Sequence, residues 1–139
     1  MQAQTLKKVV VLDFPADPSL KANVIPILND FMAGAVRDSG FSVISSADIA
    51  ASLGLERQRQ LLGCAGTSCM AEIGGALGSD YVVRGNVAVL DEDTALTVVL
   101  SDAKGTVLKQ SRQRVKGKSS SELVTALEKL IPELMGAAR

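Results

Sequence analysis

Hydrophobic positions in the amino-terminal third of the chain change from a continuous run to a helical spacing and back. Residues 6–14, "LKKVVVLDF", are apolar and β-branched at their centre without polar alternation, which is typical of a strand covered on both faces. Gly40 ends a predicted helix in which Pro26 fits the first turn, and "FSVIS", residues 41–45, predicts a second strand. The helix is marked by Val24, Ile27, Leu28, Phe31, Met32, Ala35 and Val36. These segments predict a β-α-β unit whose helix buries one face.

The middle of the chain predicts three short helices, over residues 47–53, 56–62 and 69–77. Ser45 followed by Asp48 is a capping pair that opens the first of them. Gly78 ends the third, because glycine readily adopts the left-handed conformation that closes a helix.

From Tyr81 onward the apolar period falls to two, which predicts strands joined by tight turns. The strands cover residues 81–90, 95–102 and 106–115, and the turns between them are 91–93 and 103–105. Ser119 and Glu122 form a capping box for a last helix, which carries an apolar stripe and a kink at Pro132. The predicted order of elements is β-α-β-α-α-α-β-β-β-α.

This order predicts an α/β layer structure in which helices flank a mixed β-sheet. A chain of 139 residues, of which 47% are hydrophobic, is long enough to bury a core of its own. We therefore expect a single domain over residues 6–139, preceded by a disordered segment at residues 1–5.

Composition argues against several functional classes. The chain has no histidine, which is the most frequent general base and the commonest metal ligand. Lys plus Arg and Asp plus Glu both total 15, so no net positive charge attracts nucleic acid. The longest apolar runs are far below the roughly 18 residues that span a bilayer. We expect a protein that is not an enzyme, with no cofactor, metal, nucleic-acid partner or membrane span.

Cys64 and Cys69 enclose four residues, a spacing that differs from the C-x2-C of redox-active thiols and from typical zinc ligand pairs. We expect a structural disulfide that closes a tight loop and stabilises the fold by roughly 2 kcal/mol. Two independent buried thiols, a zinc site completed by carboxylates and a catalytic dithiol are the alternatives. A disulfide implies an oxidising compartment.

Gly117-Lys118-Ser119 lies between a strand and a helix, as a phosphate-binding loop does, and Asp13 follows the first strand where a metal ligand would. However, that loop requires a glycine five positions before its Gly-Lys pair, and Arg112 occupies this position. We therefore expect an ordinary turn and helix cap. The alternative function is a small nucleotide-binding or nucleotide-hydrolysing enzyme that uses Asp13 and Lys118.

The opening residues Gln2, Ala3 and Gln4 are small and polar, as residues at a signal-peptide cleavage site often are. We expect a leader, together with any lipid anchor, to have been removed before them. A native cytosolic start is the alternative.

Four stretches together resemble the amino-terminal domain of TolB and its relatives, which include CsgG and the LpoB-type activators of penicillin-binding proteins. They are "KVVVLDF", "GFSVISSADIA", "EIGGALGSDYVVRGNVAVL" and "LTVVLSDAKGTVLKQSRQRVKG". The segment "LLGCAGTSC" is similar to an insertion in delta-proteobacterial envelope proteins. The resemblance covers roughly residues 7–135 and implies a mixed sheet flanked by helices, similar in shape to anticodon-binding domains. It also implies a protein-protein interaction module that is periplasmic or associated with the outer membrane.

The partner implied by this resemblance is another envelope protein, and two surfaces of the chain could bind it. The first is the loop that contains the cysteines, where Met70 would present a rigid apolar contact. The second is the final strand, whose Arg112 and Arg114 are typical of a protected sheet edge that accepts a chosen strand. We expect the loop to be the interface, with the sheet edge as the competing surface.

Overall fold

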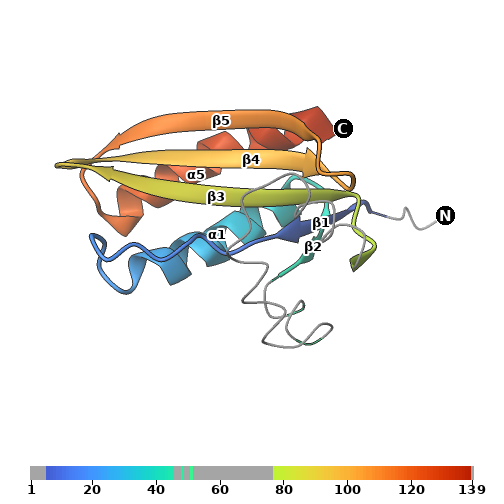
Figure 1. Cartoon of the computed structure of the whole chain (residues 1–139), viewed down its shortest axis with the longest axis horizontal. Helices are drawn as coiled ribbons and strands as arrows, with labels where there is room; N and C mark the ends of the chain where they lie inside the picture. The colour runs from blue at the N-terminus through green and yellow to red at the C-terminus, as the bar shows by residue number, and fades with distance from the viewer. Residues whose placement is uncertain (1–5, 46–47, 49–50, 52–76, 139) are drawn as a thin grey trace.

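Two long helices lie on one face of a five-stranded sheet in the computed structural model of this chain, which describes residues 6–45, 48, 51 and 77–138 (Figure 1). The strands are β1 (Lys8–Val11), β2 (Ser42–Ile44), β3 (Tyr81–Leu90), β4 (Asp93–Asp102) and β5 (Val107–Lys116). The helices are α1 (Val24–Asp38) and α5 (Ser120–Met135), and a 3-10 turn over Gly136–Ala138 follows α5.

The strands are arranged in the order β2-β1-β3-β4-β5. β1 pairs in parallel with β2 and β3, whereas β3, β4 and β5 pair antiparallel through two hairpins. The predicted mixed sheet flanked by helices is therefore confirmed. Of the three predicted short helices, only residues 48, 51 and 77 are described, each in helical conformation, and the remainder lies outside the described residues.

The first strand is shorter than the apolar run that predicted it. β1 covers Lys8–Val11, although the Leu12 N–H still donates to the Val83 carbonyl oxygen at 2.9 Å. The chain then leaves the sheet, and the Phe14 N–H donates to the side-chain oxygen of Asn29 on α1 at 2.7 Å. Leu12 and Phe14 are buried, so the apolar run extends beyond the strand because these side chains pack in the interior.

The turn between β3 and β4 is also shorter than predicted. Leu90 pairs with Asp93, so Asp91 and Glu92 alone form the turn, and Asp93 is the first residue of β4. Asp91 adopts a φ of 57°, a left-handed conformation that aspartate tolerates better than most residues. The assignment of Asp93 to the turn was therefore wrong.

α1 and α5 bury their apolar stripes against the same sheet face and form the hydrophobic core. α1 contributes Val24, Leu28, Met32 and Val36, and α5 contributes Leu123, Leu127, Leu130, Ile131 and Leu134. The sheet side of this core includes Val9, Val11, Val83, Val87, Leu96, Val98 and Leu100. Each large aliphatic side chain buried in this way stabilises the fold by about 1.5–3 kcal/mol relative to leaving it exposed.

Both predicted capping pairs form hydrogen bonds, although the described residues show only one of the two bonds of the Ser119–Glu122 capping box. At the start of α5, the Ser119 hydroxyl accepts a hydrogen bond from the Glu122 N–H at 3.3 Å. At the other cap, the Ser45 N–H and hydroxyl donate to the Asp48 carboxylate at 2.9 Å and 3.0 Å. These two bonds, the backbone one first, lower the pKa of Asp48, and the nearby charge of Arg37 lowers it further.

Gly85 of β3 lies directly against the ring of Phe14, on the core side of the sheet. A Cβ atom added to Gly85 would overlap the Phe14 ring, which is itself buried. Glycine is therefore required here by close packing, because its φ is not in the left-handed region.

We predict that Gly85→Ala lowers the free energy of unfolding by about 1–3 kcal/mol, since the Phe14 ring must shift in a filled core. Urea denaturation monitored by circular dichroism measures this. Gly34→Ala in α1 is the matched control, because its added methyl group meets nothing within 4 Å and alanine favours the helix by about 0.5–1 kcal/mol. Equal stability of Gly85→Ala and the wild type would contradict the packing argument.

Candidate functional site

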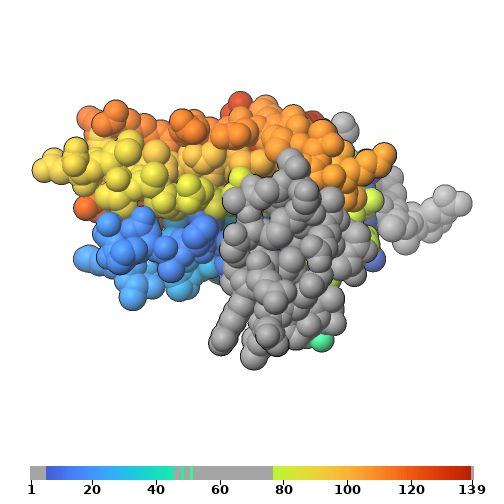
Figure 2. All heavy atoms as spheres, in the orientation of Figure 1, coloured from blue at the N-terminus to red at the C-terminus, as the bar shows by residue number. Residues whose placement is uncertain are grey.

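The face of β3, β4 and β5 turned away from the helices carries the exposed polar residues Asn86, Gln110, Arg112 and Arg114 beside the buried Val82, Val99 and Ser101, and we call it the open face. In the view of Figure 1 it is turned toward the reader, and Figure 2 shows the atoms of these strands at the surface. A shallow depression of about 180 Å³ lies on this face. Its lining is Arg84, Gly85, Asn86, Thr97, Val99, Gln110 and Arg112.

Strand register brings the arginines of this face together. Asn86 pairs with Thr97, which in turn pairs with Arg112, so the three residues form one row across the sheet. Arg84 lies two positions from Asn86 along β3 and therefore has its side chain on the same face. Among the described residues, no acidic side chain forms an ion pair with Arg84 or Arg112.

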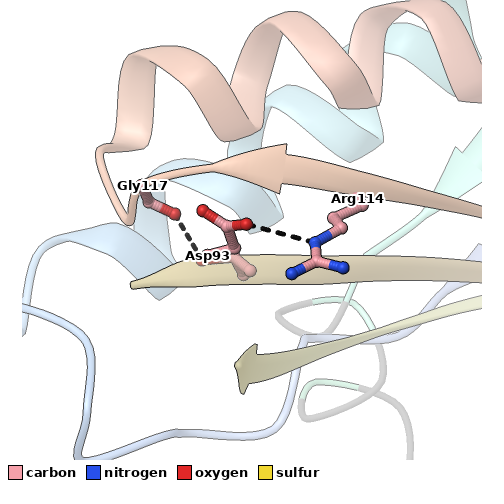
Figure 3. Close-up of polar contacts among 4 residues, drawn as sticks. Asp93, Arg114 and Gly117 are labelled. Carbon is pink, nitrogen blue, oxygen red and sulfur yellow. Dashed lines mark hydrogen bonds and ion pairs between the residues drawn. The ribbon is translucent and has the colours of Figure 1, made fainter. Parts of the chain in front are cut away.

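Arg114 lies on the same face but has an acidic neighbour. Its Nε donates to the Asp93 carboxylate at 3.1 Å, as Figure 3 shows. The Arg114 side chain is 70% exposed, and exposed ion pairs of this kind contribute at most about 1 kcal/mol to stability. The pair therefore orients Arg114 and partly neutralises its charge. Arg84 and Arg112 remain the unpaired cations of the depression within the described part of the chain.

Gly117-Lys118-Ser119, the candidate phosphate loop, is a turn that is hydrogen-bonded to a side chain of β4. The buried Thr94 hydroxyl donates to the Gly117 carbonyl oxygen at 2.6 Å (Figure 3). Gly117 has a φ of 80°, which suits glycine, and Ser119 then caps α5. The expected turn and helix cap are thus confirmed.

Lys118 lines a hollow of about 420 Å³ where α1 and α5 begin. The other lining residues are Ser19, Lys21, Asn23, Val24, Ser119 and Ser120. Asp13 is not among them, and no described hydrogen bond or ion pair joins Asp13 to Lys118. Of the two residues of the nucleotide hypothesis, only Lys118 therefore lines this hollow.

A groove of about 510 Å³ runs between α1 and α5 on the other side of the molecule, and sequence reasoning missed it. Its lining is Asp30, Phe31, Gly34, Ala35, Arg37, Asp38, Ser39, Glu128 and Pro132, and we call it the helix groove.

Phe31, which helical spacing assigned to the buried stripe, is 43% exposed in this groove. The reason is that Leu28 and Met32, four residues apart, are the residues turned to the sheet. The four-residue spacing of Asp30, Gly34 and Asp38 was the available signal.

Several predicted residues fall outside the described part of the chain. Cys64, Cys69 and Met70 are among them, so the disulfide and the loop contact stay predictions. The described residues hold no group of three or more acidic or cysteine side chains that could bind a metal ion. No described helix is long and apolar enough to cross a membrane.

Comparison with family models and with curated proteins gives no match. Among solved structures, the chain is similar to a PelC dodecamer from Paraburkholderia phytofirmans, with 16% identity, a TM-score of 0.57 and coverage of 100% and 96% of the two chains. Lipoprotein GNA1162 from Neisseria meningitidis has 14% identity, a TM-score of 0.59 and coverage of 93% and 96%. The LpoB C-terminal domain from Salmonella enterica has 19% identity, a TM-score of 0.56 and coverage of 81% and 85%.

TolB from Acinetobacter baumannii is also similar, with 15% identity, a TM-score of 0.55 and coverage of 95% of this chain and 29% of TolB. These identities are low, so the likeness concerns the fold. The chain has the fold that TolB and the LpoB domain share, and the resemblance read from the sequence is confirmed.

We predict that Thr94→Val lowers the free energy of unfolding by about 1 kcal/mol, because the Gly117 carbonyl loses its buried donor while the side-chain shape is kept. Urea denaturation checks this value. Thr97→Val is the control, since Thr97 is half-buried on the open face and its hydroxyl makes no hydrogen bond with the described residues. A Thr94→Val protein no less stable than Thr97→Val would show that the bond has no stabilising effect.

We predict that Mg-ATP leaves the melting temperature of the protein unchanged in a thermal-shift assay. A ligand at 100 times its Kd would stabilise the native state by about 2.7 kcal/mol, so specific binding would be visible. A shift in the wild type that disappears in Lys118→Ala would contradict this prediction and favour the nucleotide enzyme.

Proposed function

We propose that this chain is a non-catalytic protein-protein interaction module of the cell envelope, located in the periplasm or at the outer membrane. The observation that carries the proposal is the open face, where Arg84 and Arg112 are accessible and have no acidic partner among the described residues. Unpaired arginines on a rigid sheet favour protein recognition, because a guanidinium binds carboxylates in a fixed two-pronged geometry.

The related folds support this proposal. GNA1162 is a lipoprotein, and PelC was crystallised as a dodecamer, so the same fold occurs in a lipid-anchored protein and in a protein assembly. The expected disulfide between Cys64 and Cys69 would agree with an oxidising compartment such as the periplasm. The partner is another envelope protein.

The shape of the open face also favours a binding role. Its depression is shallow and is lined by side chains of three adjacent strands, so a partner surface can lie across it. Backbone pairing fixes the positions of these strands, which lowers the entropic cost of binding. Met70, in the loop that we expected to form the interface, stays the competing contact.

We predict that Arg112→Glu abolishes capture of the envelope partner and that Met70→Asp retains it. Crosslinking in native envelopes, followed by affinity capture and mass spectrometry, measures this. Lys104→Glu, in the turn between β4 and β5, is the control for a charge reversal outside the depression. Loss of the partner in Met70→Asp but not in Arg112→Glu would move the interface to the loop. Retention of the partner in both variants would show that neither the open face nor the loop is the interface.

A further inference from the structure

The two opposite sides of the molecule carry opposite charge. The open face presents Arg84, Arg112, Arg114 and Lys116, with Asp93 as its one described acid. The helix groove presents Asp30, Asp38 and Glu128, with Arg37 as its one cation. Because the formal net charge of the chain is zero, no overall repulsion opposes contact between two copies.

We propose that the open face of one copy binds the helix groove of a second copy of this chain. This inference rests on the proposed function, since it uses the same open face and takes as the partner a second copy of this chain, which is itself an envelope protein under that proposal. The cationic depression would receive carboxylates of the groove, and each arginine could hold a carboxylate through two parallel hydrogen bonds. Opposite charges also fix the orientation in which the two surfaces meet.

Apolar side chains complete both surfaces. Phe31 is 43% exposed in the helix groove, beside Pro132. On the open face, Leu90 is 42% exposed, whereas Val99 lines the depression but is only 6% exposed. An exposed aromatic ring next to carboxylates suits a surface that carries guanidinium groups, because arginine stacks on aromatic rings as well as pairing with acids.

Protection of the sheet edge does not account for this charge pattern. Cations on β5 alone could prevent unwanted strand pairing, since β5 is the edge strand. Arg84, however, lies on β3, the central strand of the sheet, and is half-buried. A cation at that position contributes to a face and not to an edge, which favours a partner that covers the sheet surface.

The arrangement has a consequence for the size of the assembly. The helices cover one side of the sheet and the open face lies on the other (Figure 1). When two copies bind through one open face and one helix groove, the second helix groove and the second open face are still free. Contacts between two different surfaces build a ring if the rotation closes and a filament if it does not. Assembly should therefore continue beyond the dimer.

Sedimentation velocity of the full chain, at rising protein concentration, tests this proposal. We expect species larger than a dimer at about 50 mM salt and monomers at about 500 mM, because the screening length falls from roughly 14 Å to roughly 4 Å. Monomers at every concentration in low salt would overturn the inference. The proposed function would survive that outcome if envelope capture still depended on Arg112.

Charge reversal supplies the specific test. Arg84→Glu with Arg112→Glu makes both surfaces acidic, and Asp30→Arg with Glu128→Arg makes both surfaces basic. Each double variant should associate at least about tenfold more weakly than the wild type, because like charges meet at the junction. A mixture of the two should assemble again, since every junction then joins an acidic and a basic surface.

Circular dichroism first establishes that each variant is folded, and Arg112→Glu with Arg114→Glu replaces the first pair if Arg84→Glu unfolds the protein. This second acidic variant is then mixed with the Asp30→Arg and Glu128→Arg variant in the same way. Association that survives both reversals, or a mixture that stays monomeric, would overturn the pairing of these two surfaces.

Discussion

Burial of one sheet face beneath α1 and α5 is the interaction on which the rest of this structure depends. Leu28 and Met32 from α1 belong to the same hydrophobic core as Leu96 and Leu100 from β4, and all four side chains are excluded from water. Removing this apolar area from water stabilises the fold far more than any single surface ion pair. The packing also determines which face of every strand is available for other roles.

Successive side chains of a strand point to opposite faces, so burial of one sheet face also determines which side chains lie on the open face. Once Leu96 and Val98 of β4 are turned to the helices, Thr97 between them must face the other way. The same rule places Arg112 outward on β5, where polar residues cost little. A molecule with two layers thus has a sheet surface and a helix surface on opposite sides, and their charges can differ without disturbing the core.

Local constraints then adjust the positions of the elements. Phe14 fills the space beside Gly85, and its backbone is held by Asn29 of α1, so the loop after β1 belongs to the packed interior. Thr94 connects the start of β4 to the turn before α5 through the Gly117 carbonyl. Such contacts join segments distant in sequence, which explains why the apolar run at 6–14 exceeded the strand. Phe31 was misassigned to the core because Leu28 and Met32 are the residues of α1 turned to the sheet.

The sequence by itself determined what depends on neighbouring residues: the helix periods, the hairpins, the cap at Ser119, and the outward position of Arg112 and Arg114. Hydrogen bonds and side-chain directions repeat over a few residues, so these features can be read locally. Tertiary structure alone decided that β1 lies between β2 and β3, that Arg84 and Arg112 line the same depression, and that α1 meets α5 at an acidic groove. Those choices depend on long-range pairing and on burial of the shared core, which no local pattern encodes.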